Sequence, residues 1–184
     1  MRVISGRYRG RRLKGPKDFH LRPTGDRLKE TLFNILAPRI SGAVVFDIFS
    51  GTGAIGIEAL SRGANRVIFV DRDPSANSLV LQNLQVCGVE ADYVIIKEDV
   101  FTTLRSLARQ KVPADIIFFD PPYDWQHYDD LLKLAFKPEL ASLETCVVLE
   151  HGRKAVLPES GDGFARYRTV RHGDNCLSFY RANV

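Results

Sequence analysis

The sequence predicts an α/β domain built on a doubly wound, mostly parallel sheet. From residue 43 onward, short apolar runs alternate with helix-like segments, which is typical of right-handed βαβ units with helices on both faces of the sheet. The 184 residues, 45% of them hydrophobic and 26% charged, suffice for one domain with a sizeable core. The chain ends in two apolar runs around a His-Gly-Asp turn, which indicates an antiparallel hairpin. We therefore expect a seven-stranded sheet that ends in this hairpin.

Each element has its own signal in the sequence. The expected strands are the apolar runs 43–49, 66–70, 93–96, 115–119 and 146–149 and the hairpin strands 164–170 and 176–180. Helices are expected near 54–62, 74–86, 100–110 and 127–136. A further helix precedes the first strand, because apolar residues recur at helical spacing after Thr24, a suitable N-cap, until Pro38 stops them. Glu58, on the first of the helices between strands, is expected to be solvated or locally paired.

The N-terminal region is strongly basic. Residues 1–30 carry ten lysines and arginines against three acidic residues, a balance of +7, which leaves −3 for the other 154 residues. A basic extension on a mildly acidic body is typical of polyanion binding, and a solubilising charged end is the alternative. We therefore divide the chain into a basic arm, residues 1–23, in which 2–5 and 9–13 form a short hairpin, and a folded domain, residues 24–184. The side chains assigned to polyanion binding are Arg7, Arg9, Arg11, Arg12, Lys14 and Arg22.

Composition argues against membrane and metal proteins. No apolar stretch reaches the roughly eighteen residues that a membrane span needs, and no apolar region follows the basic start, so we expect a cytoplasmic protein without a membrane partner. Cys87, Cys146 and Cys176 are odd in number and widely spaced, and the four histidines show no ligand-like spacing. We therefore expect reduced thiols and no metal.

The first strand leads into a glycine-rich turn that predicts a cofactor site. Gly51, Gly53 and Gly56 form a G-x-G-x-x-G pattern, in which the first two let the backbone turn close to a ligand and the third lets the next helix pack on the strand. Asp47, before this turn, would repel a pyrophosphate but can pair with the ammonium group of an amino-acid-bearing cofactor. The pattern therefore favours S-adenosylmethionine over NAD.

Acidic side chains follow the next two strands. Asp71 is assigned to the ribose hydroxyls, whereas Asp73, before Pro74, is expected to cap the following helix. Asp99 is assigned to the adenine amino group, and a helix N-cap is its alternative or additional role. The expected cofactor-binding residues are Asp47, Phe49, Ser50, Gly51, Gly53, Asp71, Arg72, Asp99 and Val100.

The most informative segment is Asp120-Pro121-Pro122-Tyr123, directly after the apolar run 116–119. Ligands in open α/β sheets bind beyond the carboxyl ends of such strands. The prolines stiffen the loop and lack N–H donors, so their carbonyls are expected to face the site as acceptors. One carboxylate, rigid carbonyls and a flat phenol suit an exocyclic amino group on a planar ring, although such a loop can also simply end a strand. We assign all four residues to catalysis.

Together these motifs resemble the class I S-adenosylmethionine-dependent methyltransferases of the amino-group type, and more closely the bacterial 16S rRNA guanine-N2 methyltransferases. The resemblance covers essentially the whole chain, and its more specific parts are Arg22-Pro23-Thr24 and Ser61-Arg62-Gly63-Ala64. It implies a Rossmann-like methyltransferase fold and methylation of a guanine N2 in 16S rRNA. It also implies a monomer that acts on RNA within a small-subunit assembly particle. Asp71 departs from the family, in which many members carry Glu.

Three other functions stay open. The Asp-Pro-Pro-Tyr loop also suits adenine-N6 methylation of DNA, although the chain shows no target-recognition domain. An NAD(P)-dependent oxidoreductase would need a nicotinamide site. A non-catalytic RNA-binding protein would explain the basic arm but would leave both loops without a role.

Overall fold

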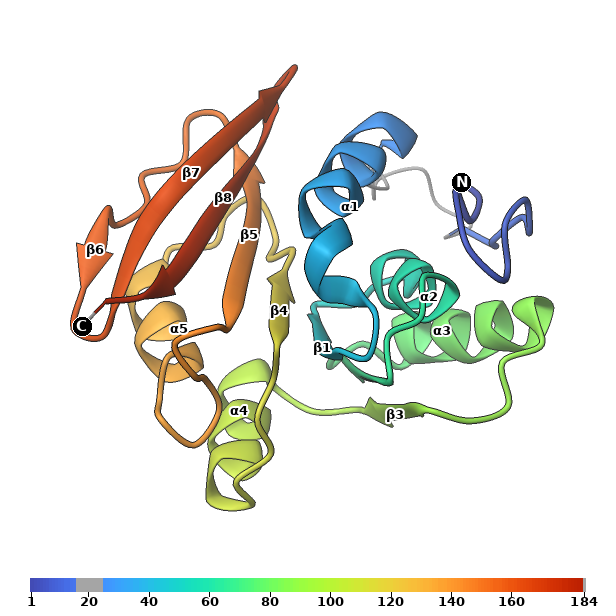
Figure 1. The fold of residues 1–184 in the computed structure, drawn as a ribbon, viewed down its shortest axis with the longest axis horizontal. Coiled ribbons are helices and arrows are strands. Elements are labelled where there is room, and N and C mark those ends of the chain that lie inside the picture. The colour runs from blue at the N-terminus through green and yellow to red at the C-terminus, as the bar shows by residue number, and fades with distance from the viewer. Residues whose placement is uncertain (16–24, 184) are drawn as a thin grey trace.

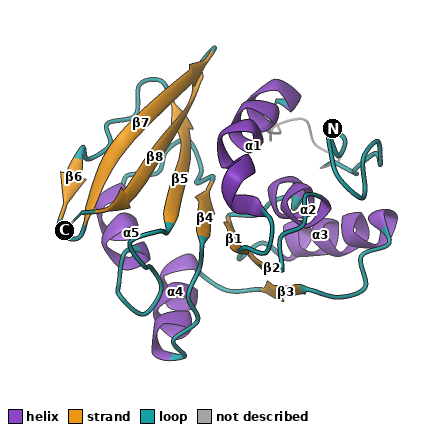
Figure 2. Cartoon of the chain, in the orientation of Figure 1, coloured by secondary structure: helices purple, strands orange, loops and turns teal. Residues whose placement is uncertain are grey.

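The structure, a computed structural model, describes residues 1–15 and 25–183. Within these residues, eight strands form one mixed sheet in the order β3-β2-β1-β4-β5-β8-β7-β6, with helices on both faces (Figures 1 and 2). The parallel part consists of β1 (Val44–Ile48), β2 (Arg66–Val70), β3 (Tyr93–Ile96), β4 (Ile116–Phe119) and β5 (Cys146–Gly152). The antiparallel part consists of β6 (Ser160–Gly161), β7 (Phe164–His172) and β8 (Asn175–Ala182).

Two hydrophobic cores lie on opposite faces of the sheet. One contains the apolar side chains of α1 (Asp26–Ile40), α2 (Ala54–Ser61) and α3 (Pro74–Cys87), and the other those of α4 (Val100–Arg109) and α5 (Tyr128–Ala135). Neighbours on β1 point to different cores, Val45 to the first and Phe46 to the second. Because central parallel strands are buried on both faces, they have the continuous apolar runs from which they were predicted. None of the helices within the described residues is long and apolar enough to cross a membrane.

The predicted fold class is confirmed, with three differences in detail. The two-residue strand β6 adds an eighth strand, and β5 continues to Gly152 because its last residues pair with β8. The prediction that Pro38 ends the first helix is wrong, since α1 runs to Ile40. A proline in the last turn removes one hydrogen bond, and the buried side chain of Ile40 holds that turn in the core. Thr24, the predicted N-cap, lies outside the described residues.

Residues 1–15, which we call the N-terminal segment, fold back on themselves and lie against the α2–α3 side of the sheet (Figure 1). The expected hairpin is present as a single antiparallel bridge between Arg2 and Arg12, supported by a hydrogen bond from the Val3 N–H to the Arg11 carbonyl (3.0 Å). Val3 and Leu13 are buried in the first core. The segment is therefore part of the packed structure over its described length.

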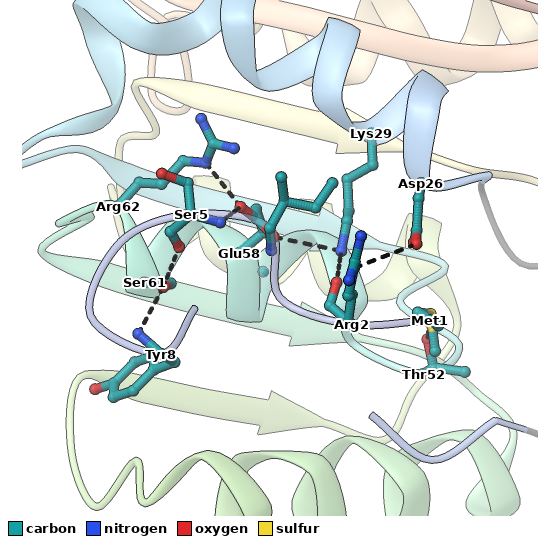
Figure 3. Close-up of polar contacts among 12 residues, drawn as sticks. Met1, Arg2, Ser5, Tyr8, Asp26, Lys29, Thr52, Glu58, Ser61 and Arg62 are labelled. Carbon is teal, nitrogen blue, oxygen red and sulfur yellow. Dashed lines mark hydrogen bonds and ion pairs between the residues drawn. The ribbon is translucent and has the colours of Figure 1, made fainter. Parts of the chain in front are cut away.

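The buried carboxylate of Glu58 on α2 holds the N-terminal segment in place (Figure 3). It accepts hydrogen bonds from the backbone N–H groups of Ile4 (2.8 Å) and Ser5 (3.0 Å). It also pairs with Lys29 of α1 at 3.3 Å and with Arg62 at 2.8 Å. Of the two roles expected for Glu58, local pairing is confirmed and solvation is wrong, because the N-terminal segment and α1 cover the outer side of α2.

Candidate active site

The glycine-rich loop between β1 and α2 has the backbone conformation that its sequence predicts. Gly51 and Gly53 have φ values of +51° and +73°, a region that glycine adopts without strain. A Cβ atom on Gly56 would lie 2.3 Å from the ring of Phe69, so only glycine lets α2 pack this closely on β2. Phe49 also has a positive φ, +61°, and such strained non-glycine residues concentrate at functional sites.

Asp47 is buried beneath this loop, with 2% of its surface exposed. It accepts a hydrogen bond from the Gly56 N–H at 2.8 Å and so ties the start of α2 to β1. Burial raises the pKa of Asp47 from 3.8 to about 7, the Gly56 hydrogen bond opposes this shift, and the nearby Asp71 adds to it. Pairing with the ammonium group of a cofactor stays a prediction for this residue.

Asp71 joins the end of β2 to the glycine loop. Its carboxylate accepts the N–H of Gly51 at 3.0 Å and the N–H of Asp73 at 2.9 Å. The residue stays partly exposed, which leaves lone pairs of a fixed carboxylate facing the carboxyl edge of the sheet. Arg72, next in the chain, is exposed.

The two helix caps predicted beside this edge are confirmed. Asp73 accepts the N–H of Ser75 at 2.8 Å, with Pro74 as the first residue of α3. Asp99 accepts the N–H groups of Phe101 and Thr102 at 2.9 and 3.1 Å and caps α4. The N-cap role of Asp99 is therefore established, and adenine binding would be an additional role of the same carboxylate.

The walls of this edge suit a ligand with a planar base, a ribose and an amino-acid end. The ring of Trp125 lies 5.0 Å from that of Phe49 and is stacked at 5.9 Å on that of Phe101, so the three rings form an aromatic wall. The hydroxyl of Ser50 is buried and has no hydrogen-bond partner within residues 1–15 and 25–183. An orphaned buried donor next to two positive-φ glycines fits the polar part of a bound ligand.

The Asp-Pro-Pro-Tyr loop borders a pocket at the ends of β4 and β5. Tyr123 projects into solvent with 72% of its surface exposed. The expectation that both proline carbonyls face the site is wrong for Pro122, whose carbonyl accepts the N–H of Trp125 at 3.0 Å and closes a turn within the loop. The pocket is lined by Asp120, Pro121, Pro122, Tyr123, Tyr128, Glu150, His151, Gly152 and Asn175.

A second carboxylate lies beside Asp120 in this pocket. Phe119 pairs with Leu149 across β4 and β5, so the next residues lie side by side, Asp120 directly after the end of β4 and Glu150 within β5. Glu150 accepts a hydrogen bond from the Asn175 side chain at 3.0 Å. Although Asp120 as a whole residue is exposed, protein surrounds its carboxyl group, and this desolvation, with the charges of Glu150 and Asp47, raises its pKa well above 3.8.

The structure brings the two predicted halves of the site together, because β1 and β4 are neighbours and Ile48 pairs with Phe119. Sequence reasoning missed Glu150 and Asn175. The only signal for Glu150 was an acidic residue after a predicted strand, and the strand order is needed to place it next to Asp120. Of the predicted polyanion contacts, Arg22 lies outside the described residues, and the other five, Arg7, Arg9, Arg11, Arg12 and Lys14, are exposed on the N-terminal segment.

Residues 1–181 match the family described as "Conserved hypothetical protein 95". The chain belongs to this family. It is 36% identical over 181 residues, 98% of both chains, to "Putative rRNA methyltransferase YlbH" of Bacillus subtilis. Over 123 residues, 67% of this chain and 60% of the other, it is 39% identical to "Ribosomal RNA small subunit methyltransferase D" of Escherichia coli.

Among solved structures, the fold is similar to "Putative methyltransferase yhhF from Escherichia coli", with a TM-score of 0.84 and 27% identity over 100% of this chain and 98% of that one. These relatives confirm the resemblance to a small-subunit rRNA methyltransferase family that the motifs indicated. They also confirm the Rossmann-like methyltransferase fold.

Proposed function

We propose that this protein transfers a methyl group from S-adenosylmethionine to the exocyclic N2 amine of a guanine in 16S rRNA. The observation that carries the proposal is the pairing of β1 with β4, which sets the glycine loop beside the Asp-Pro-Pro-Tyr loop at one edge of the sheet. The names of the relatives support ribosomal RNA of the small subunit as the substrate. A monomer acting in the cytoplasm on a small-subunit assembly particle completes the proposal.

The cofactor half of the site fits S-adenosylmethionine, which supplies an electrophilic methyl group on a sulfonium sulfur when it is bound. Asp71 would accept from the ribose hydroxyls, and Asp99 from the adenine amine. The orphaned hydroxyl of Ser50 and the backbone of Gly51 and Gly53 would hold the amino-acid end. Asp47 fixes the loop from below through the Gly56 N–H. The aromatic wall formed by Phe49, Phe101 and Trp125 would exclude water from the adenine side.

The amine half of the site holds and activates the nucleophile. The lone pair of an exocyclic amine is delocalised into the purine ring, so the amine is a poor nucleophile. If the Asp120 carboxylate and the Pro121 carbonyl accept its two N–H bonds, the nitrogen can become pyramidal and direct its lone pair at the methyl group. The raised pKa of Asp120 makes its carboxylate a better acceptor for the proton that the nitrogen then releases. Tyr123 would stack on the base.

The neighbouring carboxylates of Asp120 and Glu150 favour guanine over adenine. Guanine presents two adjacent donors, the N1–H and the N2 amine, and two carboxylates in a row match this edge. Adenine presents a donor at N6 and an acceptor at N1, and the N1 lone pair would face a carboxylate. Glu150 can accept a base N–H in addition to the Asn175 bond, because its two oxygens offer about four acceptor positions.

Methyl transfer from labelled S-adenosylmethionine to 16S rRNA transcribed in vitro tests the proposal. The RNA is offered naked and assembled with small-subunit proteins, and nucleoside analysis locates the label. We expect label in N2-methylguanosine at one position. Label in N6-methyladenosine, transfer to duplex DNA in preference to rRNA, or no transfer to either form of the RNA would contradict the proposal.

A further inference from the structure

Exposed cations flank the turn between β7 and β8, next to the Asp-Pro-Pro-Tyr pocket. Gly152, at the end of β5, and Asn175, at the start of β8, both line this pocket. Arg153 and Lys154 follow Gly152 directly, and Arg171 lies near the end of β7; all three side chains are exposed. Figure 1 shows this turn projecting beyond the carboxyl ends of β4 and β5. The three cations therefore lie at the rim of the pocket, not elsewhere on the sheet.

The backbone that carries these cations is firmly held. Asn175 is paired on both sides, with Gly152 of β5 and with His172 of β7, so the ladder extends to the very end of the hairpin. The Arg153 N–H donates to the Asp174 carbonyl at 2.8 Å and links the turn after β5 to the hairpin turn. Cations on such a support lose less conformational entropy on binding than cations on a free tail.

The charge of this rim is not neutralised by its neighbours. Across residues 1–15 and 25–183, no carboxylate forms an ion pair with Arg153, Lys154 or Arg171. Arg166, which lies near the start of β7, differs in that it pairs with Glu159. Asp174 is the acidic residue of the turn between β7 and β8, so the three cations beside it outnumber it. This excess of positive charge contrasts with the net charge of −3 on the chain beyond residue 30.

We propose that Arg153, Lys154 and Arg171 form a cationic rim that binds the phosphates flanking the target nucleotide of the RNA. This inference rests on the proposed function, since a guanine can enter a one-base pocket only when it leaves its stack. The backbone on either side of that guanine must then cross the edge of the pocket, where the rim lies. Arginine and lysine are the side chains that bind phosphate most favourably.

The position of Tyr123 connects the rim to the base pocket. A Cβ atom on Gly152 would lie 3.7 Å from the Tyr123 ring, so this ring stands directly beside the residue that precedes Arg153. A base stacked on Tyr123 would place its own backbone at the rim. The basic N-terminal segment lies beside α2 and α3, on the other side of the molecule from the β7–β8 hairpin (Figure 1). The rim thus gives the RNA a second set of contacts, on the side of the pocket that the N-terminal segment does not cover.

Binding of in vitro transcribed 16S rRNA over a salt series tests the rim. The test variant combines Arg153→Ala, Lys154→Ala and Arg171→Ala. The matched control combines Arg66→Ala, Arg109→Ala and Lys111→Ala, which are exposed cations at or near the opposite, amino edge of the sheet. The test variant should flatten the slope of log affinity against log salt by roughly 2–3, because each lost phosphate contact removes about 0.7–0.9. The control should leave the slope unchanged, and both variants should bind S-adenosylmethionine as the wild type does.

An unchanged slope in the test variant would overturn the rim, as would an equal loss in the control. If the triple variant failed to fold, each single variant would have to flatten the slope by about 0.7–0.9. Three single variants with the wild-type slope would contradict the proposed rim equally. The salt series requires no methyl transfer. A wild type that binds the RNA but forms no N2-methylguanosine would therefore count against the proposed function alone.

Discussion

Replacing Glu58 by Gln removes the charge that holds the N-terminal segment, and it should be among the most destabilising single changes in this protein. The side chains of Glu58 and Lys29 are 0% and 1% exposed and lie 3.3 Å apart. Burial lowers the pKa of Lys29 although the charge of Glu58 opposes this shift, so the ammonium group depends on that carboxylate. In Glu58→Gln, the Lys29 ammonium would keep the Arg2 carbonyl, at 2.6 Å, as its hydrogen-bond acceptor but would lose its counter-charge.

The expected loss in the free energy of unfolding follows from the buried Lys29 ammonium, which has no counter-charge in this variant. Removing one partner of a buried ion pair costs about 3–5 kcal/mol, because the other charge stays buried and uncompensated. Total stabilities of about 5–15 kcal/mol make this a large fraction of the whole. The amide oxygen of Gln can still accept one of the N–H groups of Ile4 and Ser5. Its NH₂ group cannot accept the other, so the N-terminal segment should also become more susceptible to trypsin at Arg7 and Arg9.

Urea unfolding of four variants measures this effect: Glu58→Gln, Lys29→Met, the double variant of these two, and a control. The double variant Lys29→Met/Glu58→Gln should be more stable than Glu58→Gln alone, because removing Lys29 removes the stranded charge. Asp129→Asn is the control, since it breaks an ion pair of 2.6 Å with Lys133 whose side chains are half-exposed, and it should change stability by less than about 1 kcal/mol. A loss below about 1 kcal/mol in Glu58→Gln, or simple addition of the two single losses in the double variant, would refute this reasoning.

Four further predictions concern the site. Asp120→Ala should lower the single-turnover rate of methylation by about 10²–10³, with little change in cofactor affinity, and a rate near wild type would remove its role in holding the amine. Asp71→Ala should weaken S-adenosylmethionine binding by about 1.5–3 kcal/mol in calorimetry while RNA affinity survives; unchanged cofactor binding would place the ribose elsewhere. Burial raises the pKa of Asp47 from 3.8 to about 7, so between these values the folded state keeps a proton that the unfolded state has lost. The free energy of unfolding should therefore fall as pH rises through this window, by up to about 1.4 kcal/mol per pH unit, and Asp47→Asn should flatten that fall. Deleting residues 1–14 should weaken cofactor binding as well as RNA binding, and full retention of cofactor affinity would show that the glycine loop does not depend on the N-terminal segment.

Features that depend on local sequence could be predicted. The continuous apolar runs of buried parallel strands, the caps at Asp73 and Asp99, and the two loops at the carboxyl edge all follow from residues close together in the chain. The pocket neighbour Glu150 could not be predicted, because only the pairing of β4 with β5 places it beside Asp120. The local sequence shows which residue follows a strand. The order of the strands in the sheet determines which of these residues become neighbours.

The burial of Glu58 could have been predicted from the apolar character of α2. All eight residues of α2 are buried, and apolar side chains occur on every side of this helix. A helix that is apolar all round is covered all round, so something other than the sheet had to lie on its outer side. The high charge of residues 1–30 favoured a basic, polyanion-binding arm instead. The structure accommodates both properties, because Val3 and Leu13 point into the core while the arginines and lysines of the segment stay exposed.

The N-terminal segment and the glycine loop meet at one side chain, Asn83 of α3. This buried amide donates to the carbonyl of Lys14 at 3.0 Å and to the carbonyl of Thr52 at 2.9 Å, and its oxygen accepts the Lys14 N–H at 2.7 Å. Thr52 lies between Gly51 and Gly53, so a shift of the segment changes the hydrogen bonding of the loop that would hold the cofactor. RNA that binds the cations of the segment and S-adenosylmethionine that binds the loop would then stabilise the same arrangement. Because such coupling is reciprocal, each ligand should raise the affinity for the other by the same factor.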